Sequence, residues 1–288
     1  MHARHCAYQI ASKQIFDFTH YNYCFHSKMT NLVQPKRLAA FDFDNTVVFG
    51  NTDTVVRELV TPEVPPNVQE LVKTEGWTRY MEEIFRLLHE KKITREKILE
   101  RIRCIREVPG FVRLLKSLHQ ANFDLIIISD SNSEFIREWT QAHNISNIFT
   151  QIFTNPAQFL DNGLLTIKPY HHQTECKLSA ENLCKGKILE NFIATREVDD
   201  FIKYENVVYV GDGTNDICPV MRLSENDVGC ARKGYGMKRI LEKNKTKLTA
   251  KSKLIYWNNG FDLHEQLQEH FKYGDLPDQR FESPTCPV

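Results

Sequence analysis

The chain of 288 residues lacks an excess of charge, because its 37 lysines and arginines balance 37 aspartates and glutamates. It therefore offers no bulk positive field that would attract nucleic acid or an anionic membrane surface. It also lacks long apolar runs, and stretches such as residues 125–128 are far too short to span a bilayer. We expect neither nucleic acid nor a membrane as a partner.

The cysteines lack the paired spacing of disulfide frameworks and metal ribbons. All eight are scattered, no C-x-x-C pair occurs, and a chain of this length does not need disulfide staples. We therefore expect reduced thiols and a cytoplasmic protein. The first 28 residues lack the apolar core of a secretory signal, and a transit peptide, a floppy arm or a translation start at Met29 remain the alternatives for them.

Segments typical of strands and of helices alternate along most of the chain, of which 41% is hydrophobic. This alternation predicts an α/β fold: a doubly wound parallel sheet with helices on both faces. Residues 155–179 are expected to be rich in loops. Strands are expected near 38–43, 123–128, 148–154, 207–210, 228–231 and 254–257, and helices near 67–92, 95–106, 111–119, 133–143, 181–194, 216–223, 237–243 and 262–271.

An all-helical stretch, residues 55–108, interrupts the alternation after the first strand, and we interpret it as a small inserted cap. The core then comprises residues 37–54 and 109–271. Residues 1–36 are expected to form a flexible N-terminal extension, and residues 272–288, with three prolines, a flexible tail. The sequence indicates neither the role of the extension nor the oligomeric state.

The first expected strand ends in two acids, Asp42 and Asp44. Ligands collect at the carboxyl ends of the strands of a parallel sheet, where two carboxylates this close in sequence can converge. Such a pair suits Mg²⁺, or a carboxylate nucleophile beside a second carboxyl that acts as acid and base. Taken alone, the same acids would also fit a turn in which they bond their own backbone.

Further polar residues follow at the ends of later strands and at a helix start. Ser129 follows one strand, and Asp212 and Asp216 follow another within a glycine-containing turn. Lys185 and Lys187 open a helix, where a lysine is electrostatically misplaced without an anion. Singly, each also fits a turn or a solvated charge, but the ordered set is hard to obtain by accident.

This ordered set resembles the motifs of the haloacid dehalogenase superfamily of phosphohydrolases, over residues 38–270. More narrowly, the chain is similar to the phosphoethanolamine/phosphocholine phosphatase family and its pyridoxal phosphate phosphatase branch. The superfamily motifs match Asp42-x-Asp44-x-Thr46, Ser129, a lysine at 185 or 187, and Gly211-Asp212-x-x-x-Asp216. The family stretches are FDFDNT (41–46), NTD (51–53), IISDSN (127–132), FTNP (153–156), NLCK (182–185), VGDGTNDICP (210–219) and RKGY (232–235).

The resemblance implies a Rossmann-like core and a Mg²⁺-dependent phosphomonoesterase that acts on a small molecule. Asp42 would attack phosphorus and form an aspartyl-phosphate, and Asp44 would serve as general acid and then as general base. Mg²⁺ would be held by the Asp42 carboxylate, the Asp44 backbone carbonyl and Asp212. Without a cation, Asp42 would repel a dianionic phosphate.

The resemblance also implies which residues hold the substrate. Ser129 and Lys185 would bind the phosphoryl oxygens, with Lys185 preferred because it follows the family stretch NLC, and Asp216 would support the lysine or a metal-bound water. Asp53 and Asp130 match positions that contact substrate in the family. Two extra carboxylates favour a leaving group that is positive or donates hydrogen bonds.

Pyridoxal 5′-phosphate is the substrate that the branch stretches favour, and phosphoethanolamine or phosphocholine is the alternative. A phosphomutase and a non-catalytic phosphate-binding module are further alternatives. The second acid of the first motif argues against the module, since a mere binder does not need it.

The chain departs from the family in the His/Cys-rich stretch before the lysine, because Ser179 stands where another cysteine would be expected. A zinc site built from His171, His172, Cys176 and Cys184 is therefore disfavoured, since structural zinc needs four well-spaced ligands. We expect loop residues and a half-buried thiol there.

Overall fold

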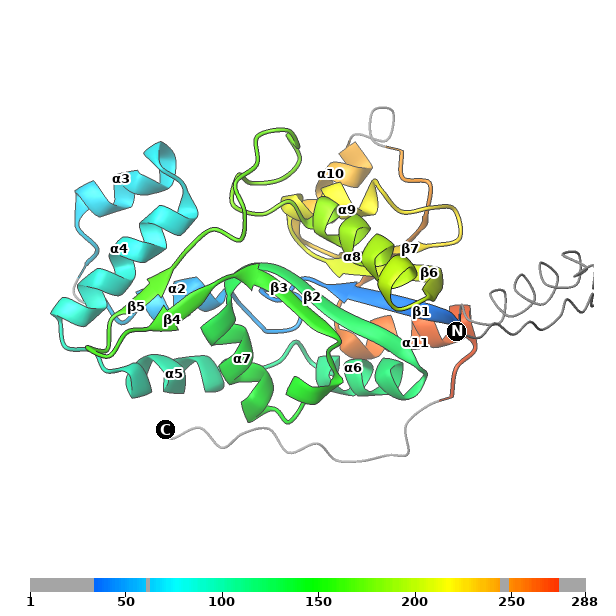
Figure 1. Ribbon diagram of the computed structural model, residues 1–288, viewed down its shortest axis with the longest axis horizontal. Helices are drawn as coiled ribbons and strands as arrows, with labels where there is room; N and C mark the ends of the chain where they lie inside the picture. Colours follow the sequence, from blue (N-terminus) through cyan, green and yellow to red (C-terminus); the bar gives the residue numbers. More distant parts are fainter. Residues whose placement is uncertain (1–33, 61–62, 244–248, 275–288) are drawn as a thin grey trace, which may run out of the picture. The chain divides into compact units, whose positions relative to one another are not determined.

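Six parallel strands form the main sheet of the computed structural model, which describes residues 34–60, 63–243 and 249–274 (Figure 1). The strand order β3-β2-β1-β6-β7-β8 places the first strand in the middle and later strands on both sides of it. The expected α/β class with a doubly wound parallel sheet is thereby confirmed. The bounds are β1 Gln34–Phe41, β2 Phe123–Asn132, β3 Gln151–Asn155, β6 Ile202–Gly211, β7 Val228–Arg232 and β8 Lys253–Trp257.

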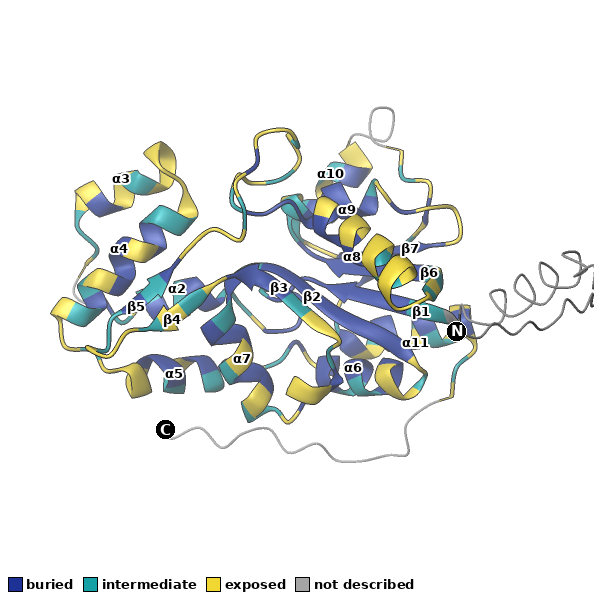
Figure 2. Cartoon of the chain, viewed as in Figure 1, coloured by how far each residue is buried: buried dark blue, intermediate teal, exposed yellow. Residues whose placement is uncertain are grey.

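Successive residues of β1 face two different helical layers, because side chains of a strand point alternately to opposite faces. Ala39 and Phe41 pack in the cluster that includes α6, α7 and α11. Leu38 and Ala40 pack in the second cluster, with α8, α9 and α10. Figure 1 shows these helix sets on opposite sides of the sheet, and Figure 2 shows buried strands beneath exposed outer helix faces. The bounds are α6 Phe111–Gln120, α7 Ser133–Ala142, α8 Lys185–Asp199, α9 Ile217–Val220, α10 Gly236–Lys243 and α11 Gly260–Phe271.

Between β1 and α6, the described residues form four helices where an inserted cap was expected. The prediction of one continuous helix at 67–92 is wrong, because the chain breaks at Gly76 into α3 and α4. Gly76 has φ 88°, a conformation outside the helical region that glycine adopts without steric cost. The bounds are α2 Thr52–Arg57, α3 Pro66–Thr74, α4 Trp77–Glu90 and α5 Arg95–Arg103.

A small antiparallel hairpin, β4 (Ala157–Phe159) and β5 (Leu165–Ile167), lies within the region that was expected to be loop. Its three-residue strands are too short to show a period in the sequence. The hairpin packs against the inserted helices: a ring nitrogen of His89 lies 3.0 Å from the Asn162 carbonyl oxygen. Residues that follow β3 therefore join the helices that follow β1.

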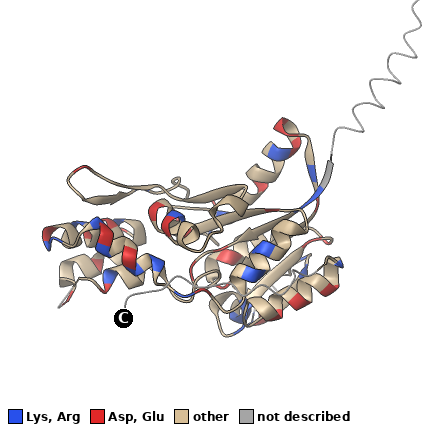
Figure 3. Ribbon diagram, turned by 90° about the horizontal axis from the view of Figure 1, so that it is seen from below, with Lys and Arg blue, Asp and Glu red and all other residues tan. Residues whose placement is uncertain are grey.

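Charged residues of both signs are interspersed over the helices, whereas the strands carry few of them (Figure 3). Along the described ranges, no helix combines the length and apolar content needed to cross a membrane. Most of the expected N-terminal extension and of the expected tail lies outside the described residues, and β1 begins at Gln34.

The starts of α6 and α11 touch through their backbones at two glycines. A Cβ added to Gly260 would lie 2.4 Å from the carbonyl carbon of Gly110, and the Gly260 N–H donates to the Pro109 carbonyl at 2.8 Å. Side chains have no room between these two turns, so the helices of this layer depend on both glycines.

We expect Gly260→Ala to lower the free energy of unfolding by about 1–3 kcal/mol, because the new methyl group overpacks a backbone contact. Urea unfolding of the variant would be compared with that of Gly274→Ala, since Gly274 is exposed and a Cβ there meets nothing within 4 Å. Equal midpoints for the two variants would contradict the contact.

Candidate active site

A fully buried lysine, Lys185, lies at the centre of the acids that follow β1 and β6. Its Nζ is 2.7 Å from Asp42 Oδ2 and 2.8 Å from Asp216 Oδ1, and its side chain has no exposed surface. Lys187 is exposed and lies 3.7 Å from Glu175 on the surface. The structure thus brings Lys185, and not Lys187, to the two motif acids.

Lys185 is the first residue of α8, where the helix dipole by itself disfavours a positive charge. Burial alone would also lower the pKa of Lys185, but Asp216 and Asp42 raise it above the usual value. The ammonium group is therefore kept charged by its two carboxylate partners, and these partners explain how a lysine is tolerated at this helix start.

Asp216 is fully engaged by donors of the chain itself. Its Oδ1 accepts from Lys185 Nζ and from the Tyr209 hydroxyl, each at 2.8 Å. Its Oδ2 accepts from the backbone N–H groups of Asp212 at 3.0 Å and Gly213 at 2.8 Å. With four donors around it, Asp216 is suited to position the lysine and the turn rather than to take up a metal.

Asp42 leaves β1 where that strand meets β6. The backbone N–H of Asp42 donates to the Val210 carbonyl at 2.9 Å, and this bond holds the first motif beside the turn that carries Asp212. Asn45 has φ 54°, and three successive N–H groups after it donate to the Phe43 carbonyl. The chain thus turns sharply after the strand, as two converging acids require.

Asp44 is held by the start of the next helix. Its Oδ1 accepts from the Thr52 N–H at 2.9 Å, and its Oδ2 accepts from Asn51 Nδ2 at 2.9 Å and from the Thr52 hydroxyl at 3.3 Å. Burial, and then the negative charge of Asp53, raises the pKa of Asp44 well above its usual value. This shift favours the protonated form of the carboxyl, which is the form that can donate a proton.

The oxygen atoms around Asp42 and Asp212 are suitable ligands for a hard cation. Carboxylate oxygens of Asp42, Asp212 and Asp216 lie within 4.8 Å of one another, and the hydroxyl of Thr46 donates to Asp212 at 3.2 Å. Burial raises the pKa of Asp42 to about 7 against the lowering effect of Lys185. Burial and the neighbouring acids raise the pKa of Asp212 to about 8.

When all three of these acids ionise, they carry more negative charge than one lysine neutralises, and their raised pKa values reflect the cost of that unbalanced charge. Oxygen ligands of this kind are those that Mg²⁺ prefers in proteins. Because Asp216 is already saturated, Asp42 and Asp212 are the side chains best able to hold the ion, with the backbone carbonyl of Asp44 as the third group that the sequence suggests.

Two further acids lie on the side of this cluster toward the inserted helices. Asp53 is buried in α2 and its Oδ2 accepts from Trp77 Nε1 of α4 at 2.7 Å. Asp130 accepts from the side-chain amides of Asn182 at 2.8 Å and Asn215 at 2.6 Å. Burial raises the pKa of Asp53 to about 6 despite the bond from Trp77, and the charge of Asp130 raises it further.

Ser129 is buried at the carboxyl end of β2, the strand next to β1, and its hydroxyl accepts from the Ser131 N–H at 3.2 Å. The sequence did not single out Trp77, Tyr209, Asn182 or Asn215, which hold the candidate acids in place. A signal was present for both asparagines, because they lie inside the motif stretches NLCK and GDGTND.

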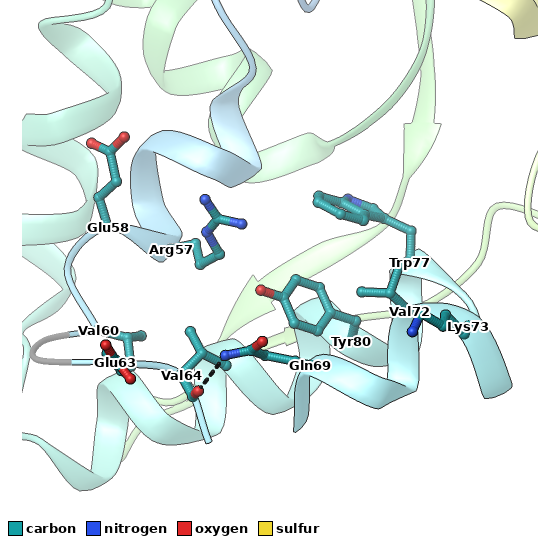
Figure 4. Close-up of a pocket in the computed structure, with 10 residues that line it drawn as sticks. All are labelled: Arg57, Glu58, Val60, Glu63, Val64, Gln69, Val72, Lys73, Trp77 and Tyr80. Carbon is teal, nitrogen blue, oxygen red and sulfur yellow. Dashed lines mark hydrogen bonds between the residues drawn. The ribbon is translucent and has the colours of Figure 1, made fainter. Parts of the chain in front are cut away.

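A cavity of 730 Å³ lies among the inserted helices, lined by side chains such as Arg57 of α2, Gln69 of α3 and Tyr80 of α4 (Figure 4). Trp77 is the lining residue that links it to the acids, through the bond to Asp53. None of the motif acids lines this cavity, so it is not the place where a phosphoryl group would react.

Comparison with known proteins gives a consistent result. Residues 37–271 match the model of the family described as "Putative Phosphatase". The bovine (Bos taurus) pyridoxal phosphate phosphatase PHOSPHO2 is 35% identical over 237 residues, which cover 81% of this chain and 98% of that protein. The human (Homo sapiens) phosphoethanolamine/phosphocholine phosphatase is 30% identical over 243 residues, 83% of this chain and 90% of that protein.

Solved structures share the fold at lower sequence similarity. The structure of a phospho-aspartyl intermediate analogue of phosphoserine phosphatase superposes with a TM-score of 0.53 at 19% identity. The alignment covers 82% of this chain and 99% of that one. The likeness concerns the arrangement of the sheet and its helices.

The raised pKa of Asp53 has a consequence for stability. The folded state favours the protonated carboxyl, so this stabilisation is complete below the ordinary pKa of 3.8 and is lost as the pH rises through about 6. We expect Asp53→Asn, which cannot ionise, to be more stable than the unmodified chain by about 1–3 kcal/mol at pH ~8, and the difference to vanish near pH ~4.

Urea unfolding in metal-free buffer at several pH values would measure this difference. Asp161→Asn is the matched control, because Asp161 is exposed in the turn of the β4–β5 hairpin. A stability difference for Asp53→Asn that does not grow with pH would refute the assignment.

Proposed function

Because this chain belongs to the phosphatase family whose model spans residues 37–271, and its motifs resemble those of the haloacid dehalogenase superfamily, we propose that it is a Mg²⁺-dependent phosphomonoesterase that hydrolyses pyridoxal 5′-phosphate. The observation that carries the proposal is the meeting of Asp42, Lys185 and Asp212 at one sheet edge, with Asp44, whose pKa is raised by burial, two residues after the first acid. Each of these groups has a distinct part in phosphoryl transfer.

Asp42 is proposed as the nucleophile. A carboxylate oxygen of Asp42 attacks phosphorus, the bond from phosphorus to the ester oxygen breaks, and Asp44 donates its proton to the leaving oxygen. The pKa of Asp44, raised well above the usual value, supports this role, because the shift favours the protonated form that acts as the acid. The product of the first step is an aspartyl-phosphate on Asp42 and the free alcohol.

The second step returns the enzyme to its starting state. Asp44, now ionised, takes a proton from water, and the water oxygen attacks the phosphorus of the aspartyl-phosphate. The bond from phosphorus to the Asp42 oxygen breaks, which releases inorganic phosphate and restores the Asp42 carboxylate. Lys185 and Ser129 bind phosphoryl oxygens during both steps, and Asp216 keeps the lysine in position. A bound Mg²⁺ would supply positive charge that offsets the repulsion between a phosphate dianion and these acids.

Asp53 and Asp130 support a leaving group that is positive or rich in hydrogen-bond donors. Among the described residues, Asp53 Oδ1 is buried and accepts no hydrogen bond, so a donor from the substrate would relieve a costly unpaired acceptor. Pyridoxal 5′-phosphate offers a ring nitrogen and a hydroxyl for such contacts. The 35% identity to bovine PHOSPHO2, named a pyridoxal phosphate phosphatase, supports this substrate.

Phosphoethanolamine or phosphocholine is the second candidate substrate. Either would place a cationic head group opposite the same two acids, and the 30% identity to the human phosphoethanolamine/phosphocholine phosphatase supports it. A phosphomutase on the same machinery would transfer the phosphoryl group within its substrate, and release of inorganic phosphate separates the two activities.

The nucleophile is tested by Asp42→Asn, whose amide cannot form the aspartyl-phosphate. We expect turnover to fall on the order of 1,000-fold or more, with an unchanged circular dichroism spectrum. Lys187→Ala serves as the control, because Lys187 is exposed outside the cluster and the variant should keep full turnover. Activity of Asp42→Asn within tenfold of the unmodified enzyme would show that another group attacks phosphorus.

The substrate is tested by kcat/KM for pyridoxal 5′-phosphate, phosphoethanolamine and phosphocholine, each with Mg²⁺ and after chelation. We expect the highest value for pyridoxal 5′-phosphate and no turnover without the metal. Asp53→Asn and Asp130→Asn should each lower kcat/KM for pyridoxal 5′-phosphate about tenfold or more, a loss of about 1.4 kcal/mol of transition-state binding. A tenfold preference for phosphoethanolamine would reverse the substrate order, and unchanged values in both variants would remove the two acids from the site.

A further inference from the structure

Three cysteines that are far apart in the sequence meet beside the candidate active site. Cys176 Sγ lies 3.4 Å from Cys218 Sγ, and Cys184 Sγ lies 3.7 Å from the same atom. All three sulfurs lie within 4.8 Å of one another, and Cys184 and Cys218 are fully buried. They are free thiols, and the proposed phosphatase chemistry uses none of them.

A fourth polar atom completes the cluster. The Ser179 hydroxyl oxygen is 3.6 Å from Cys176 Sγ and 3.4 Å from Cys184 Sγ. A tetrahedral metal with bonds of about 2.3 Å to sulfur sets its ligands about 3.8 Å apart, and slightly closer where one ligand is oxygen. The separations of 3.4–3.7 Å between these atoms are near those of such a coordination shell.

The loop that presents Cys176 and Ser179 is fixed by a buried glutamine. Gln173 Nε2 donates to the carbonyls of Cys176, Ser179 and Ala180, and its Oε1 accepts from the Cys176 N–H at 2.9 Å. Its side chain is thus used entirely to hold the loop in this shape. The cluster is therefore built before any ligand arrives, which reduces the entropy lost on binding.

The other two cysteines are brought together by close packing of α8 on α9. A Cβ on Gly186 would lie 2.6 Å from Cys218 Sγ, so only glycine lets the helix approach this sulfur. The same Cβ would lie 2.6 Å from Arg222, whose guanidinium is placed to offset the negative charge that thiolates bring.

We propose that Cys176, Cys184 and Cys218 bind one Zn²⁺ ion as thiolates, with the Ser179 hydroxyl in the fourth position. The three thiols release their protons to solvent when the ion binds, and no oxidation takes place. Thiolates select a soft or borderline cation over Mg²⁺, so this site is chemically separate from the carboxylates of Asp42 and Asp212.

The histidines of the expected zinc set stand outside this site. His171 Nε2 is occupied because it accepts from the Cys184 N–H at 2.9 Å, His172 is exposed, and neither histidine belongs to the group of ligand atoms that lie together. Cys218 takes their place, from a helix 42 residues after Cys176. The sequence could not indicate this partner, because only the packing of α8 on α9 brings it near.

The ion would hold Lys185 close to Asp216. Cys184 immediately precedes Lys185, and Cys218 follows Asp216 by two residues. A metal bonded to both cysteines therefore joins the start of α8 to the start of α9 at the level of the 2.8 Å contact between Lys185 and Asp216. Its effect on catalysis is that of a positioning element and not of a reacting group.

The test is the metal content of the full chain, purified without chelator and measured by plasma mass spectrometry. We expect about one Zn²⁺ per chain, and less than about a tenth of that in Cys218→Ser and in Cys176→Ser, because two thiolates do not retain the ion. Cys230→Ala is the matched control and should keep the ion, since Cys230 packs in the cluster on the other face of the sheet.

Cobalt gives a readout that depends on neither activity nor stability of a variant. The unmodified chain, stripped and loaded with Co²⁺, should show thiolate charge-transfer bands and the strong visible bands of a tetrahedral ion. Ser179→Cys should bind zinc at least about tenfold more tightly, because a fourth thiolate replaces a weak oxygen ligand.

Specific results would overturn the proposal. A chain that is loaded with Zn²⁺ and dialysed yet contains none, or that yields octahedral cobalt spectra, has no thiolate site. If Cys176 and Cys218 react with a thiol reagent only after reduction, they form a disulfide instead of a metal site. No gain in zinc affinity in Ser179→Cys would remove Ser179 from the fourth position.

Discussion

The buried ammonium group of Lys185 is the interaction on which the arrangement of the active site depends. A lysine with no exposed surface at a helix start is unfavourable by itself, both through lost hydration and through the helix dipole. It is tolerated because Asp42 and Asp216 contact it directly. The acids need the lysine equally, since their own burial disfavours ionisation. Removal of the lysine would leave two buried acids without the cation that compensates them.

The sheet order supplies the geometry for this pairing. β1 lies between β2 and β6, so the ends of these strands carry Asp42, Ser129 and Asp212 to neighbouring positions at one edge. The N–H bond from Asp42 to Val210 fixes the first motif against the third. The inserted helices pack against the β4–β5 hairpin. The hydrogen bond from Trp77 to Asp53 joins these helices to the acids of the site.

Much of this could be predicted from the sequence. Apolar strands such as residues 123–128 and 207–210 are recognisable because a buried parallel strand is apolar throughout. The candidate acids can be identified because they follow such apolar strands directly. Two features were missed. The apolar periodicity continues across Gly76, although the helix breaks there, and the three-residue strands β4 and β5 are too short to show alternation.

The sequence by itself determined the fold class, the order of the strands and helices along the chain, and the types of residue available at the strand ends, because these depend on local composition and periodicity. Only the tertiary structure decided which lysine is buried, that Asp216 is saturated by four donors, and that Cys218 joins Cys176 and Cys184. Each of these depends on contacts between residues that are distant in the sequence or on the burial that packing creates, and no local pattern records either.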